Sequence, residues 1–148
     1  MSTTSASPIT AALPTRIVAG VLAGLAGGVV FGILMQMMGI IPMVAMLVGS
    51  KSVAMGWLVH LFNSALFGAI YAVLAGRWAD RLGTGVPLGV AYGVAWWILG
   101  ALLIMPTWLG MPVFVFNTMA WQSLMGHVIY GLLLGVGYAV LRPRLAHR

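Results

Sequence analysis

The sequence predicts an all-α membrane protein whose four transmembrane helices form a tandem parallel duplication of one helical hairpin. Composition is the first observation behind this prediction: 62% of the 148 residues are hydrophobic and 5% are charged, whereas about a quarter of the residues in a soluble domain are charged. The second observation is a series of four long apolar segments, and the third is an internal repeat that relates the two halves of the chain. We therefore expect lipid to be the solvent for most of the molecule.

The four apolar segments cover about residues 16–39, 54–76, 86–105 and 120–141. Each is close to the roughly 20 residues that an α-helix needs to cross the hydrocarbon core of a bilayer. Residues 1–15 are polar, small and proline-containing, without the basic start and short apolar core of a secretory signal. We expect residues 1–15 to be a disordered leader and residues 16–148 to form one four-helix domain.

Two further stretches are apolar but are too short, and too rich in Pro and Gly, to span a bilayer. They are GIIPMVAMLVGSKS after the first helix and PTWLGMPVFVFNT after the third. We expect both to form short interfacial or re-entrant caps on the outer side, where protein or lipid headgroups satisfy the backbone.

Basic residues predict the orientation of the helices. The chain has seven Lys and Arg residues and a single acidic residue, Asp80. Six of the seven fall on one side of the predicted helices: Arg16, Arg77, Arg81, Arg142, Arg144 and Arg148. Lys51 falls on the other side, so the positive-inside rule places both termini and the 77–85 loop in the cytoplasm. We expect Asp80 to pair with its neighbours Arg77 and Arg81. No basic stripe lies on a folded face, so the lipid bilayer rather than nucleic acid is the expected partner.

The internal repeat predicts how the helices are related. GLAGGVVFGIL, from Gly24, matches GVAYGVAWWIL, from Gly89, at six of eleven positions. HLFNSALFGAIYAVL, from His60, matches HVIYGLLLGVGYAVL, from His127, at seven of fifteen. The copies cover about residues 16–77 and 85–144. Because each copy holds two helices, both insert in the same direction, and a pseudo-two-fold axis is expected along the membrane normal.

Small residues recur every four positions along the predicted helices, as in Gly20, Gly24, Gly28 and Gly32. Such a ridge lets backbones approach closely in lipid, where no hydrophobic effect drives helices together. Tight packing within the chain explains most of these glycines. A ridge left exposed would favour a homodimer or association with other membrane subunits.

Two histidines, His60 and His127, occupy the same position in the two copies and are the candidate cofactor-binding residues. Each lies about two turns inside its helix from the outer end, so the imidazoles are expected at one depth on either side of the axis. Ionisable residues inside membrane spans are rare and indicate function by default. The alternative is a structural role, in which each neutral imidazole bonds a backbone carbonyl or a nearby polar side chain.

Ligation of a single b-type heme by His60 and His127 is the most specific interpretation of the pair. Imidazole is a suitable axial ligand for heme iron. The arrangement is similar to the heme-binding bundle of cytochrome b proteins, with Gly32 and Gly100 expected near the depth of the histidines. One histidine per helix allows one heme, in an electron-transfer or sensing subunit.

Methionines support another interpretation, Cu(I) binding. Thioethers are soft ligands that suit Cu(I), and the pairs Met35/Met38 and Met43/Met46 have helical i,i+3 spacing. Met also fills irregular gaps in apolar packing. Besides Met1, ten methionines fall in the outer half or its caps: Met35, Met37, Met38, Met43, Met46, Met55, Met105, Met111, Met119 and Met125.

Catalysis finds little support in the sequence. The chain has no Glu and no Cys, its one Asp falls in a predicted cytoplasmic loop, and no Ser-His-acid or HExxH arrangement occurs. We therefore expect a non-enzymatic accessory or structural component of a membrane.

One stretch resembles a known family. Pro106, Gly110, Pro112, Val113 and Phe114, followed by Gly126-His127 ahead of another apolar helix, resemble the YagU family of bacterial inner-membrane proteins. The resemblance covers the second half of the chain and reaches the first half through the repeat. It implies a multi-pass protein of the inner (plasma) membrane and singles out Pro106, Pro112 and His127, without implying a reaction.

Overall fold

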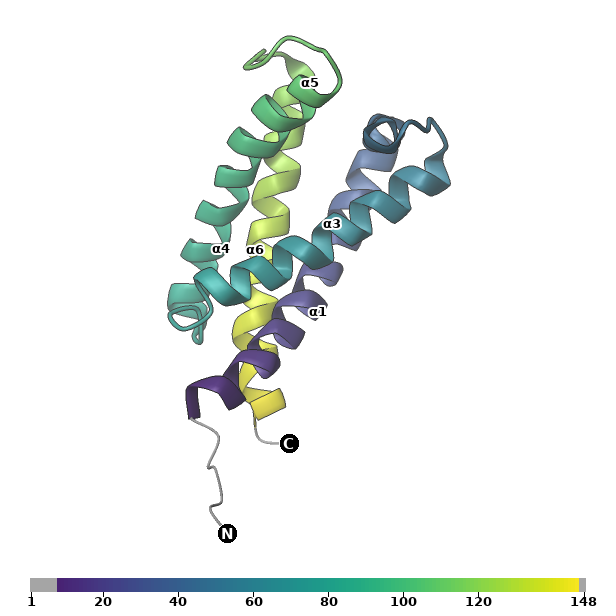
Figure 1. Cartoon of the computed structure of the whole chain (residues 1–148). Helices are drawn as coiled ribbons and strands as arrows, with labels where there is room; N and C mark the ends of the chain where they lie inside the picture. Colours follow the sequence, from purple (N-terminus) through teal and green to yellow (C-terminus); the bar gives the residue numbers. More distant parts are fainter. Residues whose placement is uncertain (1–7, 147–148) are drawn as a thin grey trace.

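The computed structural model describes residues 8–146, and this part of the chain is helical apart from its turns and connections. In chain order the elements are α1 (Pro8–Met37), α2 (Ile41–Ala45), the 3-10 helix η1 (Met46–Val48), α3 (Val53–Leu74), α4 (Leu82–Trp96), the π-helix η2 (Trp97–Ile104), α5 (Met105–Trp108) and α6 (Thr118–Ala146) (Figure 1). The stretch α4–η2–α5 is continuous and makes one span. Four spans are long and apolar enough to cross a membrane, which confirms the predicted all-α membrane fold with four transmembrane helices.

Helix α1 begins earlier than the sequence predicts. It starts at Pro8, so residues 8–15 of the expected leader are helical, while residues 1–7 of that leader lie outside the described residues. Ala-Ala-Leu within this stretch has high helix propensity. Pro14 lies near the start of the helix, where its missing N–H removes a single backbone hydrogen bond.

The four spans form two hairpins, α1–α3 and α4–α6. Helix α1 packs along both α3 and α6, and α6 packs along both α1 and α4. Helices α3 and α6 therefore lie on a diagonal, as expected for an up-down-up-down bundle. The hairpins come together at one end and diverge toward the other, which carries α2 and α5 (Figure 1).

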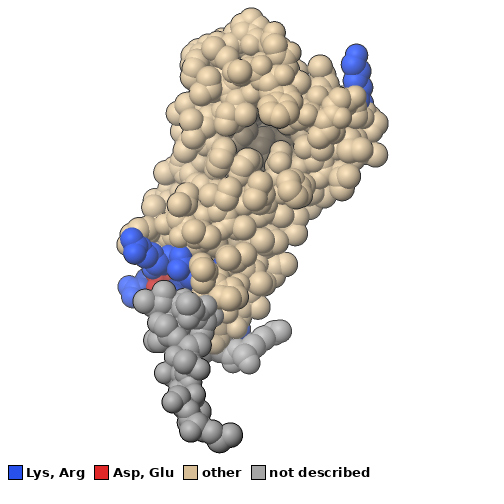
Figure 2. Space-filling view, viewed as in Figure 1, with Lys and Arg blue, Asp and Glu red and all other residues tan. Residues whose placement is uncertain are grey.

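The two ends of the bundle differ in charge. Lys and Arg side chains gather at the end where α1 begins and α6 ends (Figure 2), which we call the basic end. The opposite end, which we call the capped end, carries α2, η1, α5 and the loop 109–117. In the first cap Ile41, Val44 and Ala45 are buried, and α2 packs on α3. The first predicted cap is thus a short helical turn packed on α3. The second has a different form, because Met105–Trp108 continues the third span and residues 109–117 are a mostly exposed loop without helix.

Glycines bring the backbones within each hairpin into direct contact. A Cβ atom on Gly24 of α1 would overlap the carbonyl oxygen of Ser64 on α3. In the second hairpin, a Cβ atom on Gly89 of α4 would overlap the carbonyl oxygen of Gly131 on α6. These are corresponding positions in the sequence repeat, so the two hairpins cross at the same places.

The ridges of small residues are covered by neighbouring helices of the same chain. Gly20 and Gly68 face each other in the first hairpin, and Gly85 and Gly135 do so in the second. The ridges that favour a homodimer on sequence grounds are therefore covered by the chain's own helices. Association with other subunits stays a prediction, without this feature to support it.

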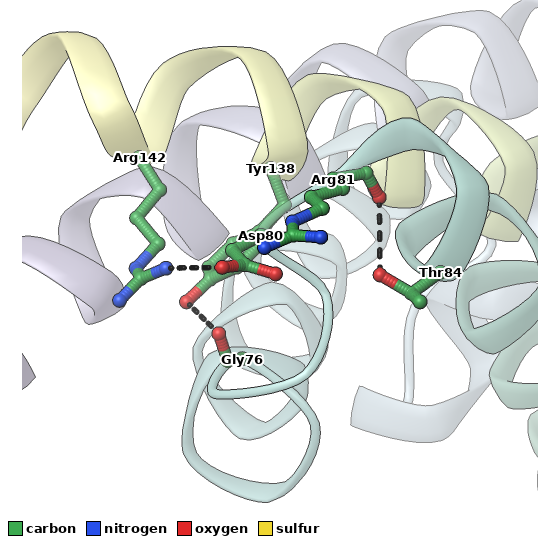
Figure 3. A network of polar contacts seen from close by, with 6 residues as sticks. All are labelled: Gly76, Asp80, Arg81, Thr84, Tyr138 and Arg142. Carbon is green, nitrogen blue, oxygen red and sulfur yellow. Dashed lines mark hydrogen bonds and ion pairs between the residues drawn. The ribbon is translucent and has the colours of Figure 1, made fainter.

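Two buried tyrosines tie the hairpins together near the basic end. The hydroxyl of Tyr71 on α3 donates to the Gly85 carbonyl, at 3.1 Å, and the hydroxyl of Tyr138 on α6 donates to the Gly76 carbonyl, at 3.0 Å (Figure 3 shows the second bond). Their rings meet edge to face with centroids 5.6 Å apart. Each tyrosine begins the Tyr-Ala-Val-Leu of its copy and bonds to the other hairpin, which gives that repeated motif a packing role.

The predicted ion pair of Asp80 has the wrong partner. In the described residues Asp80 pairs with Arg142 of α6, 3.6 Å from Nη1 to Oδ2, and not with Arg77 or Arg81 (Figure 3). The turn after α3 carries the carboxylate toward α6, while the Arg77 guanidinium lies over the Trp78 ring at 3.8 Å. The pair is partly exposed and contributes about 0–1 kcal/mol.

Candidate functional site

A cavity of about 200 Å³ lies between the diverging hairpins. All four spans contribute to its wall, and it lies in the half of the bundle nearest the capped end. The hollow between the hairpins in Figure 2 is on the side of the molecule rather than at its end. In a membrane-embedded bundle this opening faces lipid. We call this space the lateral cavity.

Aromatic side chains close the lateral cavity toward the basic end. Phe67 of α3 stacks on Trp96 of α4, with ring centroids 4.0 Å apart and an interplanar angle of 27°. The hydroxyl of Tyr92 donates to the Phe67 carbonyl at 2.7 Å. These contacts join α3 to α4 on the side of the cavity nearest the basic end. The two hairpins separate only between these contacts and the capped end.

The third span changes from α-helix to π-helix beside the lateral cavity. The wider turn of the segment Trp97–Ile104 is held by two long-range hydrogen bonds. The N–H of Phe114 donates to the Leu102 carbonyl at 2.9 Å, and the indole N–H of Trp97 donates to the Ala120 carbonyl at 2.9 Å. The loop 109–117 and α6 thus fix this wall. π-Helical turns are rare and occur frequently at functional sites.

His60 points from α3 toward α1. Its Nε2 atom is 2.8 Å from the Gly28 carbonyl oxygen, and the side chain is 8% exposed. The imidazole packs edge to face against Phe31, with ring centroids 5.4 Å apart. Gly32 makes room for the Trp57 ring and for His60, because a Cβ atom there would overlap Trp57 and lie 3.1 Å from His60 Cδ2.

His127 lies on α6 and packs against the same phenylalanine. Its Nδ1 atom is 2.8 Å from the Ser123 carbonyl oxygen, one turn back, and the Ser123 hydroxyl is 3.3 Å away. The ring centroids of His127 and Phe31 are 4.9 Å apart. Gly126 provides the space for Phe31, because a Cβ atom on Gly126 would overlap the Phe31 ring.

The structure brings the two predicted histidines to one site. His60 and His127 both line the lateral cavity, and Gly100 lines it with them. Gly32, which was expected near the same depth, lies against His60. Each imidazole bonds a backbone carbonyl, as the structural interpretation of the pair requires, yet each retains a second ring nitrogen.

A porphyrin does not fit this arrangement. The lateral cavity of about 200 Å³ is smaller than the roughly 300–1,000 Å³ of pockets for drug-sized ligands. Phe31 packs against both imidazoles, and Nε2 of His60 is bonded to the Gly28 carbonyl. Heme b ligation by His60 and His127 stays a prediction that requires Phe31 to leave and the hairpins to separate further.

Methionines line two cavities. Met35 and Met105 belong to the wall of the lateral cavity, together with the histidines. A second cavity of about 110 Å³, nearer the capped end, is lined by Met43, Met105, Met111 and Met119, among others. The two members of the i,i+3 pair Met43/Met46 have different surroundings. Met43 lines this second cavity, whereas Met46 is 39% exposed. In the described residues no cluster of three or more His, Cys, Asp or Glu side chains forms a metal site.

Sequence reasoning did not single out the aromatic residues of the site. Phe31 holds both histidines, and Phe67 and Trp96 close the cavity. One sequence feature could have indicated two of them: Phe31 and Trp96 are corresponding residues, each seven positions after the first glycine of its repeat segment. Apolar residues on helices that are apolar nearly all round give no other indication.

Fold and site together define a four-span helical membrane protein with a side-opening cavity that contains two histidines. No family model, curated protein or solved structure matches the chain.

Proposed function

We propose that this protein is a non-enzymatic component of the inner membrane that binds a small, lipid-dissolved molecule in the lateral cavity. The observation that carries the proposal is the cavity itself, which opens to the side of the bundle and places two imidazoles in an otherwise mostly apolar wall. Ligand sites commonly combine an apolar lining with a few convergent polar groups.

The proposed orientation follows from charge. The positive-inside rule assigns the basic end, and with it both termini, to the cytoplasm. The lateral cavity then lies in the outer half of the bilayer, and molecules would enter it from the outer leaflet. Kinship with the YagU family agrees with this placement and stays a prediction.

We also propose that the two hairpins arose by duplication. The matched crossings at Gly24 and Gly89, and the reciprocal bonds of Tyr71 and Tyr138, support this origin. Duplication explains why one histidine from each hairpin reaches the same cavity.

Saturable binding of a ring-bearing amphiphile tests the proposed function. Radiolabelled para-octylphenol, added to the protein in nanodiscs, is expected to bind at one saturable site per chain after subtraction of partition into empty nanodiscs. The ring would occupy the lateral cavity and the alkyl chain would leave through the opening to lipid. Uptake that rises linearly with concentration, without saturation, would contradict the proposal.

Cu(I) binding is a second candidate function, because Met35 and Met105 share the lateral cavity with the two histidines. Soft thioethers and neutral imidazoles are suitable ligands for this ion. The protein should then withdraw Cu(I) from a chromogenic chelator, and Met35→Leu combined with Met105→Leu should reduce the amount withdrawn. Met37→Leu is the control, because Met37 is 78% exposed. A wild-type protein that takes no Cu(I) rules this candidate out.

A further inference from the structure

Hydrogen bonding fixes which nitrogen of each imidazole carries the proton. A carbonyl oxygen only accepts, so a ring nitrogen at 2.8 Å from one must be an N–H. In His60 this nitrogen is Nε2, bonded to the Gly28 carbonyl; in His127 it is Nδ1, bonded to the Ser123 carbonyl. A charged imidazole in an apolar wall is costly, so the neutral form applies. Nδ1 of His60 and Nε2 of His127 are then bare acceptors.

Each of the two bare nitrogens keeps some exposed surface. Among the described residues, Arg16 Nε is the one buried side-chain nitrogen or oxygen atom without a hydrogen-bond partner. The second nitrogens of His60 and His127 have no hydrogen-bond partner either, but they do not belong to this buried set. Each of them therefore lies partly at a surface. Since both residues line the lateral cavity, that cavity is the space from which a ligand reaches them.

The neighbouring hydroxyl groups cannot serve as donors to a ligand without breaking existing bonds. Ser64 Oγ donates to the His60 carbonyl at 2.7 Å, and the Tyr130 hydroxyl donates to the Ser64 carbonyl at 2.8 Å. Asn63 adds an amide, which can donate and accept. The site therefore offers more free acceptors than free donors.

Size and lining restrict the shape of the ligand. An apolar cavity of about 150 Å³ holds a benzene molecule, so about 200 Å³ suits a single ring with small substituents. Phe31, Phe67 and Trp96 supply aromatic surfaces around such a ring. A bare metal ion would leave most of this volume unfilled.

Building on the proposed function, we propose that the lateral cavity selects a hydroxylated aromatic ring, of the phenol or hydroquinone class, with a hydrophobic tail in the lipid. The hydroxyl hydrogen is donated to a bare imidazole nitrogen, His127 Nε2 or His60 Nδ1. An ether or quinone carbonyl of the same shape offers only acceptors, and would leave these nitrogens desolvated without a partner. The site therefore distinguishes the hydroxylated form of a ring from its alkylated or oxidised form.

Three probes of nearly equal shape test this selectivity on the wild-type protein in nanodiscs. Para-octylphenol has a donor, para-octylanisole only an acceptor, and octylbenzene neither. We expect the phenol to bind about tenfold more tightly than the anisole, after correction for partition. Equal affinities, or tighter binding of the anisole, would overturn the selectivity and leave the proposed function standing. Absence of saturable binding for all three probes would overturn both, and stoichiometric Cu(I) uptake with no probe binding would make the metal the occupant.

Variants locate the acceptors. His60→Leu and His127→Leu together should remove the preference for phenol over anisole, while Phe62→Leu, a change at a 66% exposed position of α3, should retain it. A double variant that folds and keeps the full preference would show that the imidazoles are not the acceptors. The comparison of probes on the unmodified protein does not depend on the folding of any variant.

Discussion

Replacing Gly89 by leucine should disrupt the second hairpin, whereas the same change at Gly83 in the same helix should have little effect. A Cβ atom on Gly89 would overlap the Gly131 carbonyl oxygen, and backbone cannot give way as a flexible side chain can. A Cβ atom on Gly83 meets nothing within 4 Å. Overpacking typically costs about 1–3 kcal/mol, and more where backbones must separate.

The measurement is the midpoint of unfolding in mixed detergent–SDS micelles. We expect Gly89→Leu to lower it strongly, and Gly24→Leu in the first hairpin to lower it similarly, because Gly24 lies against the Ser64 carbonyl. Gly83→Leu is the control within α4. Equal midpoints for Gly89→Leu and Gly83→Leu would mean that the crossing of α4 and α6 is not as close as described.

Filling the lateral cavity should abolish ligand binding without loss of stability. Gly100 lines the cavity, and a Cβ atom there would touch only Trp96, at 3.9 Å. The side chain of Gly100→Leu would therefore occupy the space of the ligand ring, and we expect the affinity for para-octylphenol to fall at least about tenfold. Stability should be retained, because leucine has a higher helix propensity than glycine.

The matched control is Leu99→Phe, which enlarges a neighbouring side chain that is 47% exposed on the outside of the bundle. It should leave both binding and the unfolding midpoint unchanged. If Gly100→Leu binds the probe as well as the wild type does, the ligand is not in the lateral cavity.

The four spans and the charge asymmetry were accessible from the sequence, because hydrophobic length and basic flanks are local properties. The hairpin crossings were accessible as well, since glycine at every fourth position has few purposes in lipid other than close packing. Gly24 and Gly89 show this directly, as each meets a backbone carbonyl of its partner helix.

The divergence of the hairpins was not accessible. It depends on the aromatic contacts of Phe67, Trp96 and Tyr92, which join α3 to α4 on one side of the cavity only. On helices that are apolar nearly all round, periodicity does not distinguish a residue facing lipid from one facing a cavity. The π-helix was missed for a related reason, since its Trp97 and Leu102 are held by tertiary bonds.

The site was predicted in part. His60 and His127 stood out because ionisable residues are rare in membrane spans and these two recur in the repeat. Their tautomers depend on the carbonyls of Gly28 and Ser123, and the first of these comes from another helix. Asp80 shows the same limit, because the sequence indicated Arg77 and Arg81 and the turn after α3 brings Arg142 closer.

Photolabelling tests most directly whether the lateral cavity is the binding site. A diazirine derivative of para-octylphenol, irradiated with the protein in nanodiscs and followed by peptide mass spectrometry, should label cavity-wall residues such as Trp96 and Met105. Excess unlabelled para-octylphenol should compete for this labelling. Labelling confined to lipid-facing residues such as Leu58 and Phe62, which are 64% and 66% exposed, and unaffected by competitor, would contradict the account.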